Sequence, residues 1–206
     1  FDFYERLSAT KQFELEVKGI SSIMDKVMKD LRATQYIILD VRFNGGGIDE
    51  VGLEILRRFN PERKRIAWKK ARHKNGYTNN IEIILEASGE PYTKPVYILT
   101  SRQSASATDM MVLGSLELKH TKRIGSRTQG ALSDALQKQL PNGWRFSLSN
   151  EIYTDNPGMI YESIGIPVDY ELKYPSDRQT FFRSVANNPG LDKKNILNAI
   201  EGLKGK

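Results

Sequence analysis

The amino-acid sequence predicts an α/β domain, and two apolar segments with similar surroundings carry that prediction. Tyr36–Val41 and Pro95–Thr100 are nearly unbroken apolar runs rich in β-branched residues. Such runs are typical of strands in a parallel sheet, where both faces are covered. Each run is followed by a short polar or glycine-rich turn and then by an apolar helical pattern. Repeated strand–turn–helix units indicate an α/β fold, and we predict one domain over residues 1–206.

The first unit is flanked by two amphipathic helices. Apolar residues three and four positions apart predict a helix over Ile20–Leu31, with Gly19 just before it. After the first strand, the segment RFNGGG at 42–47 forms the turn. A second apolar stripe predicts a helix over Ile48–Phe59, and Asp49 suits the positive end of its dipole.

The second unit and its surroundings follow the same logic. The predicted turn at Ser101–Ser104 leads into an apolar helix over Ala105–Leu118. Ile81–Leu85 is predicted as a strand between the two units. Alternating apolar residues on both sides of Pro141–Gly143 predict a β-hairpin. The stripe in Leu191–Leu203 predicts a closing helix, expected to cap the core.

Composition excludes several classes of protein. The absence of cysteine rules out a disulfide scaffold, thiol catalysis and cysteine-ligated metal, and we predict neither metal nor cofactor. No apolar run approaches the ~18 residues of a membrane span, so no membrane span is predicted.

The net charge of +6 has a local origin. Arg63–Lys74 holds seven Lys and Arg residues and no acid, which leaves −1 for the rest of the chain. A nucleic-acid site is one interpretation of this basic run. We favour a solvated strand or loop in which Ile66 and Trp68 are buried, because no nucleic-acid motif accompanies it.

Three segments could carry chemistry, although each has a purely structural interpretation. The glycines of Asn44–Gly47 could expose backbone N–H groups, or simply make a tight turn. A serine within Ser104–Asp109 would lie where free helical amides could stabilise an oxyanion, or could act only as a cap. Glu162, in Tyr161–Asp169, precedes a Gly-apolar-Pro turn and could equally be a surface residue.

Taken together, the order and spacing of four motifs are more specific than any one of them. ILDVRFNGGG, LTSRQSASATDM, IGSRTQGALSD and YESIGIPVD resemble the C-terminal-processing (tail-specific) protease family of serine peptidases over about residues 20–172. The resemblance implies a Clp-protease/crotonase-like spiral of strand-turn-helix units with a hairpin region and a C-terminal helix. It also implies a serine-type endopeptidase that acts on peptides or proteins, forms homo-oligomers in some relatives, and is exported to the bacterial periplasm or cell envelope.

The resemblance assigns roles to particular residues. Ser106 matches the nucleophile, and the amides of Ala107 and Gly46 match the oxyanion hole, with Gly47 as the close alternative. Glu162 matches an active-site glutamate. The residues expected to contact substrate are Gly47, Gly130 and Ala131.

One departure from the family pattern concerns the general base. Ala131 stands where the tail-specific branch has its catalytic Lys, so a Ser–Lys dyad at that position is excluded. The sequence therefore resembles more closely the branch of the tricorn core and the interphotoreceptor retinoid-binding proteins. The active site of the tricorn-like branch is a Ser-His-Ser-Glu tetrad. In that branch the His lies upstream of the helix that begins here at Ile20. Neither His73 nor His120 matches that His, because both come after this helix in the sequence.

Two hypotheses remain open on the sequence. The chain opens at Phe1–Tyr4 without an initiator Met, and we expect it to lack an N-terminal part that supplies the base. On this hypothesis the chain is the core of a serine peptidase. The alternative is a catalytically inactive relative that binds peptide or an apolar ligand.

Overall fold

The computed structural model describes residues 9–204, and Phe1–Tyr4 lie outside that range. The helices are α1 (Ala9–Leu31), α2 (Asp49–Arg57), α3 (Ala107–Ser115), α4 (Arg178–Ala186) and α5 (Pro189–Lys204). The strands are β1 (Ile37–Asp40), β2 (Lys64–His73), β3 (Gly76–Tyr77), β4 (Ile81–Leu85), β5 (Val96–Thr100), β6 (Thr121–Gly125), β7 (Ala135–Gln139), β8 (Arg145–Ser149), β9 (Glu151–Thr154) and β10 (Tyr170–Glu171).

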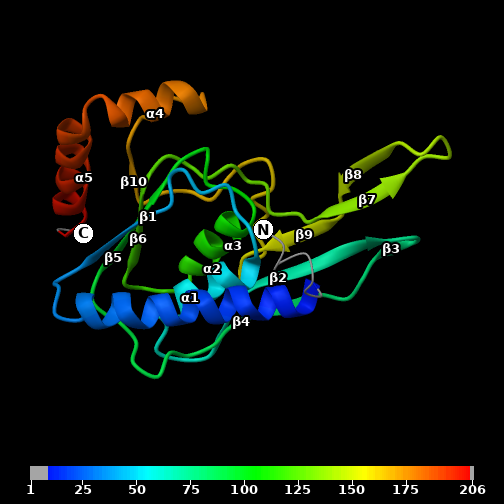
Figure 1. Cartoon of the computed structure of the whole chain (residues 1–206), viewed down its shortest axis with the longest axis horizontal. Coiled ribbons are helices and arrows are strands. Elements are labelled where there is room, and N and C mark those ends of the chain that lie inside the picture. Colours follow the sequence, from blue (N-terminus) through cyan, green and yellow to red (C-terminus); the bar gives the residue numbers. More distant parts are fainter. Residues whose placement is uncertain (1–8, 205–206) are drawn as a thin grey trace.

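A parallel sheet in the order β1-β5-β6-β10 forms the centre of the molecule (Figure 1). All five residues of β5 are buried, as its unbroken apolar run predicts. Val96 and Ile98 belong to one core cluster, and Tyr97 and Leu99 belong to another. Since successive side chains of a strand point to opposite faces, both faces of this sheet are covered. The α/β fold predicted from the sequence is confirmed.

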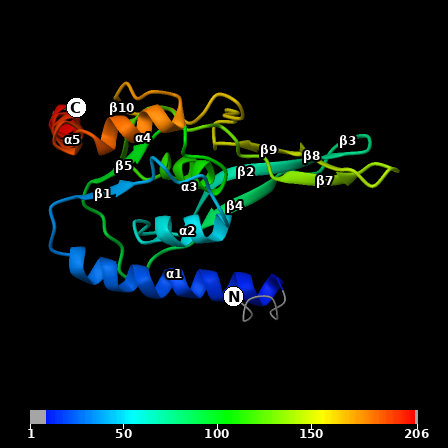
Figure 2. The same ribbon diagram turned by 45° about the horizontal axis from the view of Figure 1, so that its top comes forward.

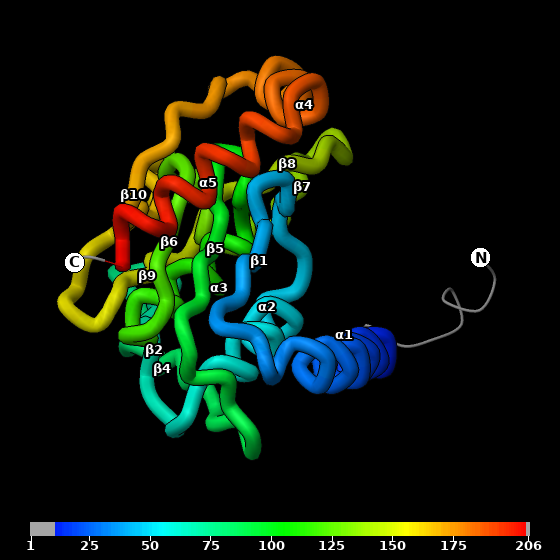
Figure 3. Tube along the Cα trace, turned by 90° about the vertical axis from the view of Figure 1, so that its left-hand side faces the viewer, coloured from blue at the N-terminus to red at the C-terminus, as the bar shows by residue number. Residues whose placement is uncertain are grey.

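Helices cover the sheet on its two sides. The first core cluster joins the sheet to α1, α2 and α3, which bury residues such as Met28, Leu56 and Leu113. On the opposite face α5 packs Ile196 and Ile200 against the sheet, and Figure 3 shows it crossing in front of β6, β5 and β1. The closing helix therefore caps the core, as predicted.

The basic run forms part of a second, antiparallel sheet. β2 lies between β4 and β9, with β3 pairing at its far end. Ile66 is buried and Trp68 is half-buried beneath the Arg65 guanidinium, 4.2 Å from the ring centroid. The cations of β2 pair with acids of neighbouring strands, Arg65 with Glu82 at 3.0 Å and Lys69 with Glu151 at 3.3 Å. These contacts support the structural interpretation of the basic run.

The predicted hairpin is formed by β7 and β8, which pair with each other alone and extend away from the body (Figure 2). Every residue of both strands is exposed.

Several boundaries differ from the sequence predictions. α1 begins at Ala9 rather than Ile20, so Gly19 lies inside the helix and not before it. The residues before Gly19 are good helix formers, and the half-buried Phe13 and Val17 continue the apolar stripe toward the N-terminus. α3 begins two residues later and ends three residues earlier than predicted.

The elements that were not predicted include β6, β10 and α4. The sequence of β6, TKRIG, looks too polar for a central strand. Arg123 is nonetheless buried, because its guanidinium pairs with Asp169 at 2.5 Å. α4 was not predicted because it has no regular apolar stripe. Its two phenylalanines are adjacent in the sequence and face different surroundings. No helix within residues 9–204 has the length and apolar character needed to cross a membrane.

Candidate active site

The turns that follow β1 and β5 lie side by side at the carboxyl edge of the parallel sheet, where α/β folds place their binding sites. The Ser104 hydroxyl donates to the Val41 carbonyl at 2.8 Å, and the Ala105 amide donates to the Asn44 carbonyl at 3.2 Å. These bonds fix the glycine turn after β1 against the serine turn before α3.

Ser106 is the exposed serine of this pair of turns. Ser104 is fully buried and its hydroxyl is engaged, whereas Ser106 is exposed immediately before the first turn of α3. Its backbone φ is +56°, a conformation that costs a non-glycine residue about 1–3 kcal/mol. Such strain persists only where the surroundings impose it, and it concentrates at functional sites. The conformation holds the hydroxyl at the positive end of the helix dipole.

Gly46 lies against the backbone of Ser106 so closely that no side chain fits between them. A Cβ on Gly46 would lie 2.6 Å from the Ser106 Cβ and 2.7 Å from the Ala105 carbonyl oxygen. The Gly46 φ of +102° also favours glycine. The sequence prediction that Gly46 and Ser106 form one site is therefore consistent with the geometry.

The amides of the predicted oxyanion hole differ in their availability. The Gly46 amide donates to the Asn44 side-chain oxygen at 2.9 Å. Within the described residues, the amides of Ala107 and Gly47 have no hydrogen-bond acceptor. Gly46 could stabilise an oxyanion only if Asn44 turned away, so Gly47 becomes the stronger partner for Ala107.

A buried carboxylate that sequence reasoning missed supports the serine turn before α3. Asp109 is fully buried and accepts hydrogen bonds from the amides of Ser106 at 3.0 Å, Gly130 at 3.0 Å and Ala131 at 2.9 Å. Burial raises the pKa of Asp109, while the three amides act in the opposite direction. An acid three residues after a helix-capping position was its only signal in the sequence. The amides of Gly130 and Ala131 are thereby engaged within the protein, and a contact of these two residues with substrate stays a prediction.

We expect Asp109→Asn to lower the free energy of unfolding by about 2–4 kcal/mol, because an amide nitrogen would face backbone N–H donors in a buried site. Asp177→Asn is the matched control, since Asp177 is the exposed N-cap of α4 and Asn caps equally well. Denaturant unfolding measures both variants. Equal losses in the two would contradict the assigned role of Asp109.

Glu162 contacts the two residues that follow Gly130 and Ala131. Its Oε2 accepts from the amides of Leu132 at 2.9 Å and Ser133 at 3.1 Å. The following residue, Ser163, has a φ of +62° and donates its amide to the Gly130 carbonyl at 2.6 Å. Ser106 and Ser163 are the non-glycine residues with positive φ among those described, and both flank the loop that Asp109 holds. The structure thus connects Glu162 to the serine turn before α3 through residues 130–133.

Asp49 belongs to a group of acids at the start of α2, just beyond the glycine turn. Burial raises its pKa to about 6, and the neighbouring Asp134, Glu50 and Glu151 act in the same direction. Lys69 partly offsets them. No set of His, Asp or Glu side chains in residues 9–204 is arranged to hold a metal ion.

We expect Asp49→Asn to flatten the dependence of stability on pH. Because the folded-state pKa exceeds the ordinary 3.8, Asp49 favours folding at acidic pH, and that contribution is lost as pH rises from about 4 through 6. Between pH 4 and 7.5, the free energy of unfolding of the variant should therefore fall by about 1 kcal/mol less than that of the parent, after screening by solvent. Urea unfolding at several pH values measures this, with exposed Asp30→Asn as the control. Parallel curves for parent and Asp49→Asn would contradict it.

Neither histidine lies at Ser106. The His120 carbonyl accepts from the Val96 amide at the amino end of β5, whereas Ser106 follows the carboxyl end of that strand. The five residues of β5 separate them by about 16 Å. His73 is exposed at the far end of β2, where it pairs with β3. No acid, lysine or imidazole of the described residues hydrogen-bonds the Ser106 hydroxyl.

A small apolar cavity of about 90 Å³ lies beside the two free amides. Its lining comes from β1, the glycine turn, α2 and the first turns of α3, and comprises Leu39, Val41, Asn44, Gly46, Gly47, Ile48, Val51, Gly52, Ile55, Ala107, Thr108 and Met111. This composition suits a short apolar side chain.

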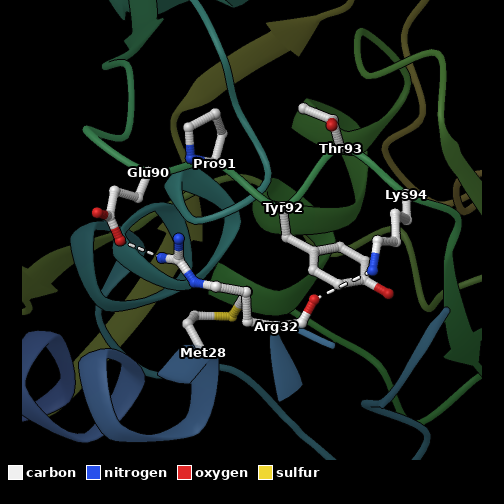
Figure 4. Close-up of a pocket in the computed structure, with 7 residues that line it drawn as sticks. All are labelled: Met28, Arg32, Glu90, Pro91, Tyr92, Thr93 and Lys94. Carbon is white, nitrogen blue, oxygen red and sulfur yellow. Dashed lines mark hydrogen bonds and ion pairs between the residues drawn. The ribbon is translucent and has the colours of Figure 1, made fainter. Parts of the chain in front are cut away.

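A second pocket has no connection with this site. Figure 4 shows Met28 of α1 and Arg32, which directly follows that helix, facing Glu90 and Tyr92, which precede β5. An ion pair between Arg32 and Glu90 crosses it. It lies at the amino edge of the sheet, at the opposite end of β5 from Ser106.

A comparison with models of protein families identifies one family. A family model of peptidase family S41 matches residues 9–172. No curated protein matches the sequence.

Solved structures share the fold. A protein from Parabacteroides merdae described as a candidate peptidase is 26% identical, with a TM-score of 0.70, over 81% of this chain and 56% of its own. The photosystem II D1 C-terminal processing protease is 21% identical, with a TM-score of 0.60, over 82% and 42%. Mature CPAF in complex with lactacystin is 13% identical, with a TM-score of 0.71, over 90% and 48%. The chain thus spans about half the length of these structures.

Proposed function

Since the chain belongs to peptidase family S41, we propose that it is the core of a serine endopeptidase with Ser106 as its nucleophile. The observation that supports this most is the exposed Ser106, held at positive φ before α3 and in contact with the glycine turn. Membership of this family supports a peptidase activity, and we propose peptides or proteins as the substrates.

The reaction we propose is acyl transfer. The Ser106 hydroxyl oxygen attacks the scissile carbonyl carbon, and its proton passes to a general base. The negative charge that forms on the carbonyl oxygen is stabilised by the Ala107 amide and, on the opposite side, by Gly47. The protonated base gives its proton to the leaving nitrogen, so collapse of this intermediate releases the amine and leaves an acyl-Ser106 ester, which water then hydrolyses.

The base is the part that residues 9–204 do not supply at Ser106. We propose a histidine from a segment preceding this chain, as the tetrad of the tricorn-like branch implies. A serine hydroxyl is a poor nucleophile without such a base. Glu162 would orient that histidine, because only its Oε2 accepts hydrogen bonds from the described residues and Oε1 remains available.

The cavity beside Gly47 supports a preference for one kind of side chain on the substrate residue that contributes the scissile carbonyl. Its walls are the apolar side chains of β1, α2 and α3, and it contains no charged group. We therefore propose that a small apolar side chain occupies it during catalysis.

Labelling with a fluorophosphonate tests the proposed nucleophile. The reagent is applied to the 206-residue chain and to the longest natural form of the protein, and the modified serine is located by mass spectrometry of the peptide Gln103–Lys119. Modification of Ser106 together with peptide hydrolysis is the expected result. A folded long form that remains unlabelled would reject the proposal.

A second candidate function is binding without catalysis. The observations that favour it are Ala131 in the position of the catalytic Lys and the absence of a described base at Ser106. It predicts that peptides or apolar ligands raise the melting temperature of the Ser106→Ala variant as much as that of the parent, without hydrolysis by either.

A further inference from the structure

An aromatic surface lies on the other side of the glycine turn from the apolar cavity. Phe43, three residues after the end of β1, stacks on the fully buried Phe181 of α4 at 4.5 Å between ring centroids. The next residue, Phe182, meets Phe43 edge-on at 5.8 Å and is 60% exposed. We call Phe43 and Phe182 the aromatic shelf.

The shelf is a built feature and not the end of a loose helix. Arg42 pairs with Asp40 at 2.7 Å and with Asp192 of α5 at 2.9 Å, and it also donates to the Tyr174 hydroxyl at 3.0 Å. Figure 1 shows α4 above the carboxyl edge of the sheet and α5 beside the sheet. The Arg42 contacts fix Tyr174 and α5 to the segment after β1, and α4 is held there by Phe181, whose ring packs against both Phe43 and Tyr174. An exposed phenylalanine on a fixed helix leaves apolar area in contact with water, at a cost in free energy.

Three cavities follow one another along this turn. The first opens between Phe43 and Phe182, with a polar rim of Asp177, Arg178 and Gln179. The second is lined by Asp40, Phe43, Asn44 and Gly45. The third is the apolar cavity beside Ser106, which Asn44 also lines. Phe43 thus joins the first cavity to the second, and Asn44 joins the second to the third.

We propose that the aromatic shelf is a second substrate subsite, which takes a large apolar or aromatic side chain of the same peptide whose scissile residue lies at Ser106. This inference rests on the proposed function for the identity of its occupant. Side chains on one side of an extended peptide recur every second residue. A peptide lying along Phe43–Gly47 would place one such side chain in the cavity by Gly47 and another on the shelf. Phe182 is then a specificity-determining residue outside the catalytic machinery.

Peptide binding to the Ser106→Ala variant tests the shelf without requiring catalysis. The probes are fluorescein-labelled decapeptides of Ala, Ser and Gly with one central Leu. They form pairs that carry either Phe or Ser at one of the remaining positions, and each remaining position has its own pair. Fluorescence anisotropy gives the dissociation constants. At one position we expect Phe to bind about 10-fold more tightly than Ser, the scale expected for burying a large apolar side chain.

Substitution of Phe182 then isolates the subsite. Phe182→Ala should remove the preference for Phe at that position and leave the affinity for the Ser peptide unchanged. Phe182→Leu should retain most of the preference. Leu191→Ala, which removes another exposed apolar side chain from the neighbouring α5, should have no effect.

The outcomes separate this inference from the proposed function. An unchanged ratio of Phe to Ser affinities in Phe182→Ala at every position overturns the subsite, as does the absence of peptide binding altogether. Peptides that bind with the expected preference but are neither hydrolysed nor accompanied by Ser106 labelling would instead reject the peptidase and leave the subsite standing.

Discussion

Ser106→Ala is expected to abolish both fluorophosphonate labelling and peptide hydrolysis, the latter by roughly 10⁶-fold in a catalytically complete form of the protein. Alanine keeps the Cβ and removes only the oxygen that forms the acyl bond. The side chain is exposed, so the free energy of unfolding should change by less than about 0.5 kcal/mol.

Ser176→Ala is the matched control for that variant. Ser176 is also exposed near the carboxyl edge of the sheet, where its carbonyl accepts from Gln103 and its hydroxyl has no partner among the described residues. It should keep full activity. Hydrolysis that survives Ser106→Ala would show that another group is the nucleophile, and loss in both variants would point to a disturbed fold.

Gly46→Ala should damage both stability and activity. The added Cβ would lie 2.6 Å from the Ser106 Cβ, 2.7 Å from the Ala105 carbonyl oxygen and 3.0 Å from the Ala107 nitrogen. None of these is the end of a flexible side chain, so the turns themselves must separate. The φ of +102° adds strain for any residue with a side chain. We expect a loss of about 2–4 kcal/mol in the free energy of unfolding.

The same displacement should affect catalysis. Moving the Ala107 amide and the Ser106 hydroxyl by about 1 Å is expected to lower kcat/KM by roughly 10²-fold or more. Gly45→Ala is the control, because nothing lies within 4 Å of its added Cβ. It should stay within about 0.5 kcal/mol of the parent and remain active. Denaturant unfolding and peptide hydrolysis measure both variants, and equal behaviour of the two would contradict the close approach at Gly46.

The sequence predicted the central elements well because their signals are local. β5 is buried along its whole length, so nearly every residue in it is apolar. β1 has a similar apolar run, but it is an edge strand in which Ile37 is buried while Ile38 and Asp40 are exposed. The short hairpin around Pro141–Gly143 follows from turn chemistry and alternation. Such patterns need no knowledge of distant residues.

The elements that sequence reasoning missed depend on distant partners. Arg123 can lie in a central strand because Asp169 pairs with it across 46 residues. Phe181 and Phe182 are neighbours with no periodic pattern. Phe181 is buried against both Phe43 and Tyr174, whereas Phe182 contacts Phe43 and stays exposed. The importance of Asp109 appears only when the amides of residues 130 and 131 reach it.

By itself the sequence determined the α/β class, the peptidase family and the serine, glycine and glutamate that mark the candidate site, because each is written as a local pattern or as an ordered set of motifs. The tertiary structure alone decided which groups are available there. It engaged the Gly46 amide with Asn44, left those of Gly47 and Ala107 free, and took up the Gly130 and Ala131 amides on Asp109. The physical reason is that availability is set by hydrogen-bond partners and burial, which arise where segments far apart in the chain meet.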